Sequence, residues 1–215
     1  MILYYHPLSS YCWKLLIALY ENGTAFQARR LDQPGVAEEW LVRWPIGKFP
    51  VLHDPARDET VAEASVIIEY LDYHAPGPFR AIPDERDAAL EVRLMDRLFD
   101  NYLMTPVQTL VGERIRPDGA AGDPHGASQA RQLLGKAYAL LEQRMAGRTW
   151  AAGDSFSLAD CAAAPALFYA DRIEPMRGGF PRLAAYLDRL EARQSFARVL
   201  REKEPVWHMF PFADG

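Results

Sequence analysis

The sequence predicts an α/β domain followed by an all-helical domain. The first third of the 215 residues alternates strand-like and helix-like segments, and the last two thirds carry apolar residues at helical spacing. Between them, Ala75–Pro83 holds three prolines and one glycine, a composition that cannot continue a helix. We therefore divide the chain into a first domain (1–76), a linker (77–86) and a helical domain (87–215).

The first domain is expected to follow the order βαβ, then a hairpin, then a helix. Asn22-Gly23 ends the first helix, and Pro50 suits the first residue of a strand. A polar turn at 54–59 joins the last two strands. The expected strands are Ile2–Tyr5, Phe26–Arg30, Pro50–His53 and Thr60–Ala62, and the expected helices are Tyr11–Glu21, Ala37–Arg43 and Glu63–His74.

The second domain is expected to contain only helices. Asp84–Arg116 reads as one long helix or two in series, kinked or split by Pro106. Four further helices are expected at Ala127–Ala146, Leu158–Ala170, Phe180–Arg193 and Ser195–Glu202. The segment after Pro205 is rich in aromatic residues and is expected to pack back on the body.

Ser157 and Asp160 have the spacing of a capping box at a helix start. The Ser157 hydroxyl can accept from the N–H of Asp160, and the Asp160 carboxylate can reach back to the N–H of Ser157. We interpret this pair as structural, and we expect Cys161, the next residue, to lie in the core.

The composition disfavours several classes of function. A net charge of −5 argues against nucleic acid as a main partner. The two cysteines, Cys12 and Cys161, form no disulfide framework and fit a reducing compartment. We see no signal peptide and no apolar run long enough to span a membrane, so a cytoplasmic protein is expected. We also see no metal-ligand motif.

Two serines stand directly before the first helix. Ser9 and Ser10 therefore bring hydroxyl groups to a helix N-terminus, where free N–H groups favour a negatively charged ligand. Glu63-Ala64-Ser65 opens a second helix after a strand in the same way. Its N–H groups and the Ser65 hydroxyl suit a carboxylate, and Glu63 suits an ammonium, although ordinary capping explains the same residues.

Lys48-Phe49-Pro50 joins a loop to the third strand. A cis bond before Pro50 would turn the backbone N–H and C=O of Phe49 outward beside the first helix, whereas a trans proline would simply open the strand. Spacing alone leaves both forms open.

Ser9-Ser-Tyr-Cys12 lies where a thioredoxin-like domain carries Cys-x-x-Cys, but Ser9 replaces the first cysteine. A dithiol–disulfide cycle through this motif is therefore impossible. A serine hydroxyl at this place would instead donate to a ligand's thiolate and lower that thiol's pKa. We expect Cys12 to be a buried apolar thiol and His6 an ordinary residue at a strand end.

The joint order of these motifs resembles the glutathione transferase superfamily over essentially the whole chain. The segments Val66–Leu71 and Asp154–Asp160 are close to the sequence patterns that are usual at these places in the family. The resemblance implies a thioredoxin-like N-terminal domain with a glutathione site, and a helical C-terminal domain. It also implies a homodimer.

The resemblance places glutathione against particular residues. Ser9 would hold and activate the thiolate, with Ser10 as the neighbouring substitute. The backbone of Phe49, before Pro50, would pair with the cysteinyl portion of glutathione, and Lys48 would approach the glycyl carboxylate. The γ-glutamyl end would meet Glu63 and Ala64. Here the sequence departs from the family, because the usual serine is Ala64 and Ser65 follows it.

A second, hydrophobic pocket for an electrophile is expected between the domains. Its candidate residues are Leu8 and Tyr11 near the first turn, and Phe99 and Tyr102 in the helix around Phe99–Met104. Ser-Ser-x-x-Trp in the first turn also resembles the zeta class, whose members isomerise maleylacetoacetate, but Tyr11, Cys12 and Lys48 depart from that class.

The expected function is conjugation of the glutathione thiolate to a small hydrophobic electrophile, as in detoxification, with glutathione as co-substrate. Two alternatives stay open. One is a glutathione-dependent isomerase, or a reductase that uses Cys12. The other is a non-catalytic binding protein of the same fold.

Overall fold

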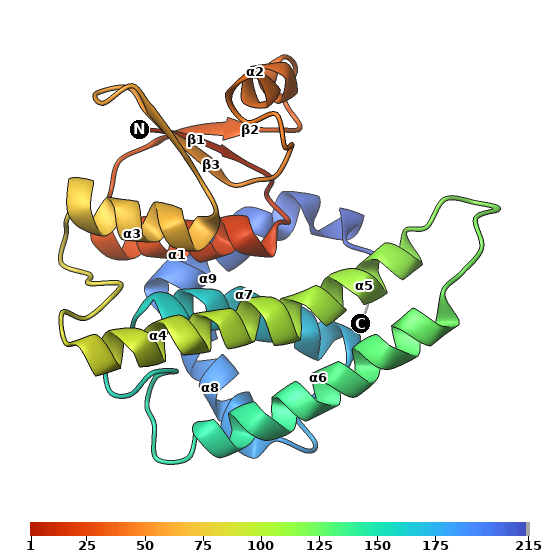
Figure 1. Ribbon diagram of the computed structural model, residues 1–215. Helices are drawn as coiled ribbons and strands as arrows, with labels where there is room; N and C mark the ends of the chain where they lie inside the picture. The colour runs from red at the N-terminus through yellow and green to blue at the C-terminus, as the bar shows by residue number, and fades with distance from the viewer. Residues whose placement is uncertain (214–215) are drawn as a thin grey trace.

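The computed structural model describes residues 1–213 and contains one sheet beside a layered set of helices (Figure 1). The sheet order is β2-β1-β3-β4, with β1 parallel to β2 and antiparallel to β3, and with β3 and β4 as a hairpin. The four strands are β1 (Ile2–Tyr5), β2 (Gln27–Arg30), β3 (Val51–Asp54) and β4 (Glu59–Ala62). The prediction of four strands in βαβ-plus-hairpin order is confirmed.

Helices cover both faces of this sheet. α1 (Ser10–Asn22) and α3 (Ala64–His74) lie on one face, and α2 (Val36–Arg43) lies on the other (Figure 1). α1 ends at Gly23, whose φ of 62° is left-handed and whose N–H donates to the carbonyl of Leu19. Residues 12–19 of α1 are all buried, because this helix packs on the sheet with one side and on α7 and α9 with the other.

The rest of the chain is helical, as predicted. The helices are α4 (Arg86–Leu98), the π-helix η1 (Phe99–Met104), α5 (Thr105–Arg114), α6 (Pro124–Arg144), α7 (Leu158–Ile173), α8 (Pro181–Glu191), α9 (Gln194–Lys203) and the 3₁₀-helix η2 (Glu204–Met209). No helix within residues 1–213 has both the length and the apolar composition needed to cross a membrane.

Pro106 neither splits its helix nor simply kinks it, because the helix continues past Pro106 after a stretch of π-helix. α4, η1 and α5 follow one another as a single rod, and the six residues before Thr105 widen into the π-helix (Figure 1). Proline lacks an N–H and its ring clashes with the carbonyl four residues earlier, so a wider turn before Pro106 relieves the conflict. The same turn brings Asp100 and Asn101 to a cavity described below.

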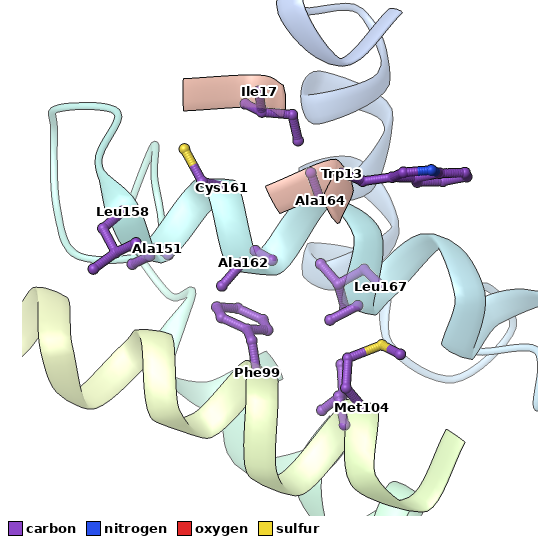
Figure 2. Close-up of a cluster of buried hydrophobic side chains, with 14 of the residues drawn as sticks. Trp13, Ile17, Phe99, Met104, Ala151, Leu158, Cys161, Ala162, Ala164 and Leu167 are labelled. Atoms are coloured by element: carbon purple, nitrogen blue, oxygen red, sulfur yellow. The ribbon is translucent and has the colours of Figure 1, made fainter. Parts of the chain in front are cut away.

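α7 lies at the centre of the core. Its alanines allow close approach of α1 on one side and of η1 on the other (Figure 2). Trp13 and Ile17 come from α1, and Phe99 and Met104 come from η1 (Figure 2). Cys161 is fully buried among them, as expected. One apolar cluster therefore joins α1 to the helical region.

The linker is attached to both regions: on the helical side, its Ala81 carbonyl accepts from the Leu158 N–H of α7 at 2.9 Å. Its N–H groups at Ala81 and Ile82 donate to the Asp72 carboxylate of α3, and the Phe79 N–H donates to Asn22. α3 ends at His74 and α4 begins at Arg86. Because α1 shares its core with α7, the division into domains at 76 and 87 stays a prediction.

The start of α7 depends on the predicted capping box. The Asp160 carboxylate accepts from the Ser157 N–H at 2.9 Å, and the Ser157 hydroxyl accepts from the Ala159 N–H at 3.3 Å. Asp160 is also bonded to the Ala151 N–H and the Tyr186 hydroxyl, so it joins a loop and α8 to α7.

Replacing Ser157 by alanine is expected to lower the free energy of unfolding by about 1–2 kcal/mol, because the N–H of Ala159 loses its acceptor. Urea unfolding followed by circular dichroism measures this loss. Ser155→Ala, in the loop before the helix, is the control and should leave the free energy of unfolding nearly unchanged. Equal effects of the two substitutions would contradict the capping role.

The aromatic C-terminal segment packs on the body, as expected. Phe210 is buried, and its ring contacts those of Tyr169 and Trp207 at centroid distances of 5.0 and 4.8 Å. The Arg114 guanidinium donates to the carbonyl of Pro211 at 3.1 Å. These contacts fix the segment beside α5 and α7, where it forms a wall of the second cavity described below.

Candidate active site

Ser9 is the N-cap of α1. Its hydroxyl oxygen accepts from the Cys12 N–H at 3.3 Å, and its carbonyl accepts from the Trp13 N–H. A serine hydroxyl has one proton to donate besides the lone pairs that accept. Within residues 1–213 no protein acceptor takes that proton, so it is available to a ligand atom at the helix N-terminus.

Two cavities meet at Ser9. One, which we call the polar cavity, has a volume of about 460 Å³ and is lined by polar, charged and apolar groups in about equal measure. The other, the apolar cavity, has a volume of about 370 Å³ and is largely apolar. Ser9, Phe49 and Gln108 line both of them. A group held at Ser9 therefore faces a polar compartment on one side and an apolar compartment on the other.

The polar cavity collects all but one of the residues predicted to bind glutathione. Its lining includes Ser9, Lys48, Phe49, Pro50, Glu63, Ala64 and Ser65. Ser10 is buried and lines the apolar cavity instead.

The bond between Phe49 and Pro50 is cis, which decides between the two forms that the sequence left open. The indole of Trp40 donates to the Lys48 carbonyl at 3.3 Å and packs on the Phe49 ring, so α2 supports this loop.

Glu63 precedes α3 with a φ of 69°, a left-handed value that is uncommon for a residue with a side chain. Its side chain is exposed and makes no capping hydrogen bond to α3, so the carboxylate remains available at the cavity wall. The first N–H groups of α3 are likewise uncapped by a side chain. Glu63 and the start of α3 thus offer an acceptor and donors together.

The Ser65 hydroxyl is already used inside the protein. It accepts from Lys14 Nζ at 2.8 Å and from the Arg97 guanidinium at 2.5 Å, and it donates to Asp96 at 2.9 Å. Its one proton and both lone pairs are therefore engaged. Ser65 does not supply the hydroxyl that Ala64 lacks.

Lys14, Ser65, Asp96, Arg97 and Asp100 form what we call the Lys14 cluster. The Lys14 ammonium, with a side chain 1% exposed, pairs with both carboxylates and lies 2.7 Å from Asp100. Arg97 pairs with the same two carboxylates from the solvent side. Burial raises the pKa of the Asp100 carboxyl, and the Lys14 ammonium opposes that rise. The cluster joins α1 and α3 to α4 and η1.

The Lys14 cluster also brings charge to the polar cavity. Ser65, Arg97 and Asp100 line it, and the Arg97 side chain is 48% exposed. Nothing in the sequence indicated that Arg97 and Asp100 line this cavity. Their spacing on one helix gives no signal of a cavity, and only the buried partner Lys14, 83 residues before Arg97, fixes their position.

The predicted electrophile pocket is only partly brought together. Leu8 lines the apolar cavity, but Tyr11 lines the polar cavity, where burial and the nearby Asp100 carboxylate raise its pKa to about 12. Phe99 is fully buried against α7, and Tyr102 is exposed; neither lines either cavity (Figure 2). The apolar wall comes instead from Met104, Val107, Val111, Ile115, Tyr169, Met209, Phe210 and Pro211.

The π-helix explains why Phe99 and Tyr102 do not line the cavity as predicted. Helical periodicity predicted the correct helical rod but not which face of the rod borders the cavity, because the π-helix shifts the residues that face it. The apolar tail was a signal for Met209 and Phe210, but the sequence did not say which surface the tail covers.

Cys12 is a poor nucleophile in this structure. It is fully buried in the first turn of α1, and burial raises the pKa of its thiol to about 12. The reactive form of cysteine is the thiolate, which is therefore scarce at neutral pH. This disfavours the reductase alternative. Residues 1–213 also contain no group of three or more His, Cys, Asp or Glu side chains placed to hold a metal ion.

We expect Cys12 of the folded protein to resist iodoacetamide at pH 8 and to react after denaturation. The reason is that burial blocks access and the raised pKa keeps the thiol protonated. Mass spectrometry of peptic peptides measures the labelling, and free glutathione in the same tube confirms that the reagent is active. Rapid labelling of Cys12 in the native protein would restore the reductase alternative.

Comparisons with known proteins show the family of this chain. Residues 3–79 match the family model for the glutathione S-transferase N-terminal domain, and residues 110–189 match that for the C-terminal domain. A stringent starvation protein A homolog from Coxiella burnetii is 30% identical over 210 residues, which cover 95% of this chain and 93% of that protein.

Solved structures are also similar. A glutathione S-transferase from Methylobacillus flagellatus with glutathione bound has a TM-score of 0.81 and 27% identity, and the match covers 92% of this chain and 98% of that one. One from Methylobacterium radiotolerans in complex with glutathione sulfonate has a TM-score of 0.79 and 30% identity, covering 92% and 93%. This chain belongs to the glutathione S-transferase superfamily, with that family's thioredoxin-like and helical architecture.

Proposed function

We propose that this protein is a glutathione transferase that joins the glutathione thiolate to a small, hydrophobic, uncharged electrophile. The observation that carries the proposal is the position of the Ser9 hydroxyl at the junction of the polar and apolar cavities. The polar cavity suits a charged tripeptide and the apolar cavity suits its reaction partner.

The residues present fit glutathione. The γ-glutamyl carboxylate would meet the first N–H groups of α3 and the Arg97 guanidinium, while Glu63 would face its ammonium. The backbone of Phe49 would pair with the cysteinyl unit, and Lys48 would approach the glycyl carboxylate. Arg97 then contributes the positive charge at the place where Ala64 lacks a hydroxyl.

The chemistry assigned to Ser9 is stabilisation of an anion. Its hydroxyl would donate to the glutathione sulfur, and the N-terminus of α1 would add a favourable partial charge. Each unit by which the thiol's pKa falls corresponds to about 1.4 kcal/mol. The thiol proton leaves to solvent, and the thiolate forms the new C–S bond at an electrophilic carbon in the apolar cavity.

Two measurements test this function. Ultraviolet difference titration of the glutathione complex should give a thiol pKa below that of free glutathione, and assays with a panel of aryl halides and unsaturated carbonyl compounds should show turnover. An unchanged pKa of bound glutathione, or no turnover of any electrophile, would contradict the proposal.

A non-catalytic binding role is the second candidate. It is favoured by the saturated Ser65 hydroxyl and the missing hydroxyl at Ala64, which reduce the donors available to the γ-glutamyl end. Retention on immobilised glutathione without turnover would support this role.

We further propose that the protein is a cytoplasmic homodimer that acts in detoxification. Exposed apolar side chains on α3 and α4, at Val66, Tyr73, Leu90 and Leu94, support a second copy covering this surface. The two free, buried cysteines support a reducing compartment. Sedimentation equilibrium measures the oligomeric state, and a monomer at micromolar concentration would contradict the dimer.

A further inference from the structure

The apolar cavity contains few polar groups besides the serines at its edge. Residues 1–213 contribute to its lining no side chain with a full charge of Asp, Glu, Lys or Arg. The Tyr169 hydroxyl lines it but is already used, because it donates to the Leu8 carbonyl at 2.8 Å. His6 and Gln108 are left as polar side chains in the lining; His6 directly follows β1 and Gln108 belongs to α5.

The His6 imidazole is fixed in orientation. Its Nδ1 accepts from the Leu8 N–H at 3.2 Å, and its ring is stacked on Phe49 with the centroids 5.9 Å apart. A neutral imidazole that accepts at Nδ1 carries its proton on Nε2 and donates there. Burial lowers the pKa of this histidine, so the neutral form prevails at pH 7.

His6 therefore combines a fixed tautomer, a rigid ring and a place in the same cavity as Ser9. A preorganised neutral donor of this kind stabilises negative charge that develops on an oxygen, and it needs no proton transfer. An alkyl halide, by contrast, develops its charge on the departing halide and has no oxygen for such a donor.

Resting on the proposed transferase function, we infer that His6 is a catalytic residue whose Nε2–H hydrogen-bonds the carbonyl oxygen of an α,β-unsaturated carbonyl substrate, so that the preferred reaction is conjugate addition. The glutathione sulfur forms a bond to the β-carbon. The C=C π electrons move into the bond between the α-carbon and the carbonyl carbon, and the C=O π electrons move onto the oxygen, which gives an enolate. His6 keeps its proton and stabilises this oxygen. Water then protonates the α-carbon, which replaces the proton that the thiol released.

Two substitutions separate the two nitrogens of His6. The amide of His6→Asn can still accept from the Leu8 N–H, as Nδ1 does, but it does not reach the position of Nε2. The amide nitrogen of His6→Gln lies near the position of Nε2 and can replace its donor. His125→Asn, at an exposed site on α6 that lines neither cavity, is the matched control.

The experiment compares kcat/KM for an enone, such as 4-phenylbut-3-en-2-one, with that for benzyl chloride. His6→Asn should lower the value for the enone by about 10²-fold and change the value for the halide less than about threefold. His6→Gln should recover at least a tenth of the enone activity, and His125→Asn should match the wild type for both.

The outcomes are distinguishable. Wild-type turnover of both compounds with equal losses in His6→Asn, or with no loss, would overturn the assignment of His6 and leave the transferase function standing. A wild type that binds glutathione but turns over neither these two compounds nor any other electrophile of the panel would overturn both. A selective loss for the enone with recovery in His6→Gln would support the role of His6.

Discussion

Ser9→Ala should lower kcat with a good electrophile by about 100-fold at pH 6.5 while changing the affinity for glutathione little. Within residues 1–213 the Ser9 hydroxyl donates to no oxygen or nitrogen acceptor, and it lies at the N-terminus of α1 where the two cavities meet. If this hydroxyl lowers the thiol's pKa by two units, its loss removes about 2.7 kcal/mol of thiolate stabilisation. Binding changes less, because Phe49, Glu63, Arg97 and the start of α3 remain.

The pH–rate profile is the decisive measurement for Ser9. The pKa of bound glutathione should rise toward that of free thiol in Ser9→Ala, so activity should partly recover as the pH approaches 9. Ser9→Asp keeps an acceptor for the Cys12 N–H but places a carboxylate beside the sulfur, and it should be less active still. Ser10→Ala is the neighbouring control. Loss of activity in Ser10→Ala alone would contradict the assignment of Ser9.

Lys14→Met should lower the free energy of unfolding by about 3–5 kcal/mol. The reason is that the buried carboxylates of Asp96 and Asp100 would keep, among residues 1–213, only Arg97 as a cationic partner. The Ser65 hydroxyl would also lose one of its donors. Because the cluster joins α1 and α3 to α4 and η1, this loss falls on the contact between the sheet region and the helices.

Urea unfolding followed by tryptophan fluorescence measures the effect of Lys14→Met. Arg131→Met is the matched control, since Arg131 lies on α6 in a half-exposed pair with Glu174 and should change stability by less than about 1 kcal/mol. Adding Asp100→Asn to Lys14→Met should recover part of the loss, because one unpaired carboxylate disappears. A loss below about 1 kcal/mol in Lys14→Met would contradict the electrostatic role of the cluster.

Local patterns predicted the elements of this fold well. Strand alternation, the Asn22-Gly23 stop and the capping box at Ser157 all act within a few residues, so the sequence carries them directly. The order βαβ-hairpin-helix then restricts the sheet to few arrangements. The local sequence could not predict the cis bond between Phe49 and Pro50, because it suits both isomers equally.

The site was predictable where one short segment builds it and not where distant segments meet. Ser9, Phe49 and Glu63 each follow or precede an element end, and the structure brings them to one cavity. Arg97 and Asp100 were missed because a buried lysine on α1 positions them. Phe99 and Tyr102 were assigned to the wrong surroundings because the π-helix changes which side chains of the rod face the cavity.

The π-helix η1 also sets the relative rotation of α4 and α5. α4 turns Asp96 toward Lys14, and α5 turns Val107, Gln108 and Val111 toward the apolar cavity. Deleting one residue from η1, such as the exposed Asn101, would rotate α5 by about 100° against α4 and carry those three side chains away from the apolar cavity. Insertions and deletions in this short stretch therefore offer a means to reshape that cavity while the anchoring of α4 is retained.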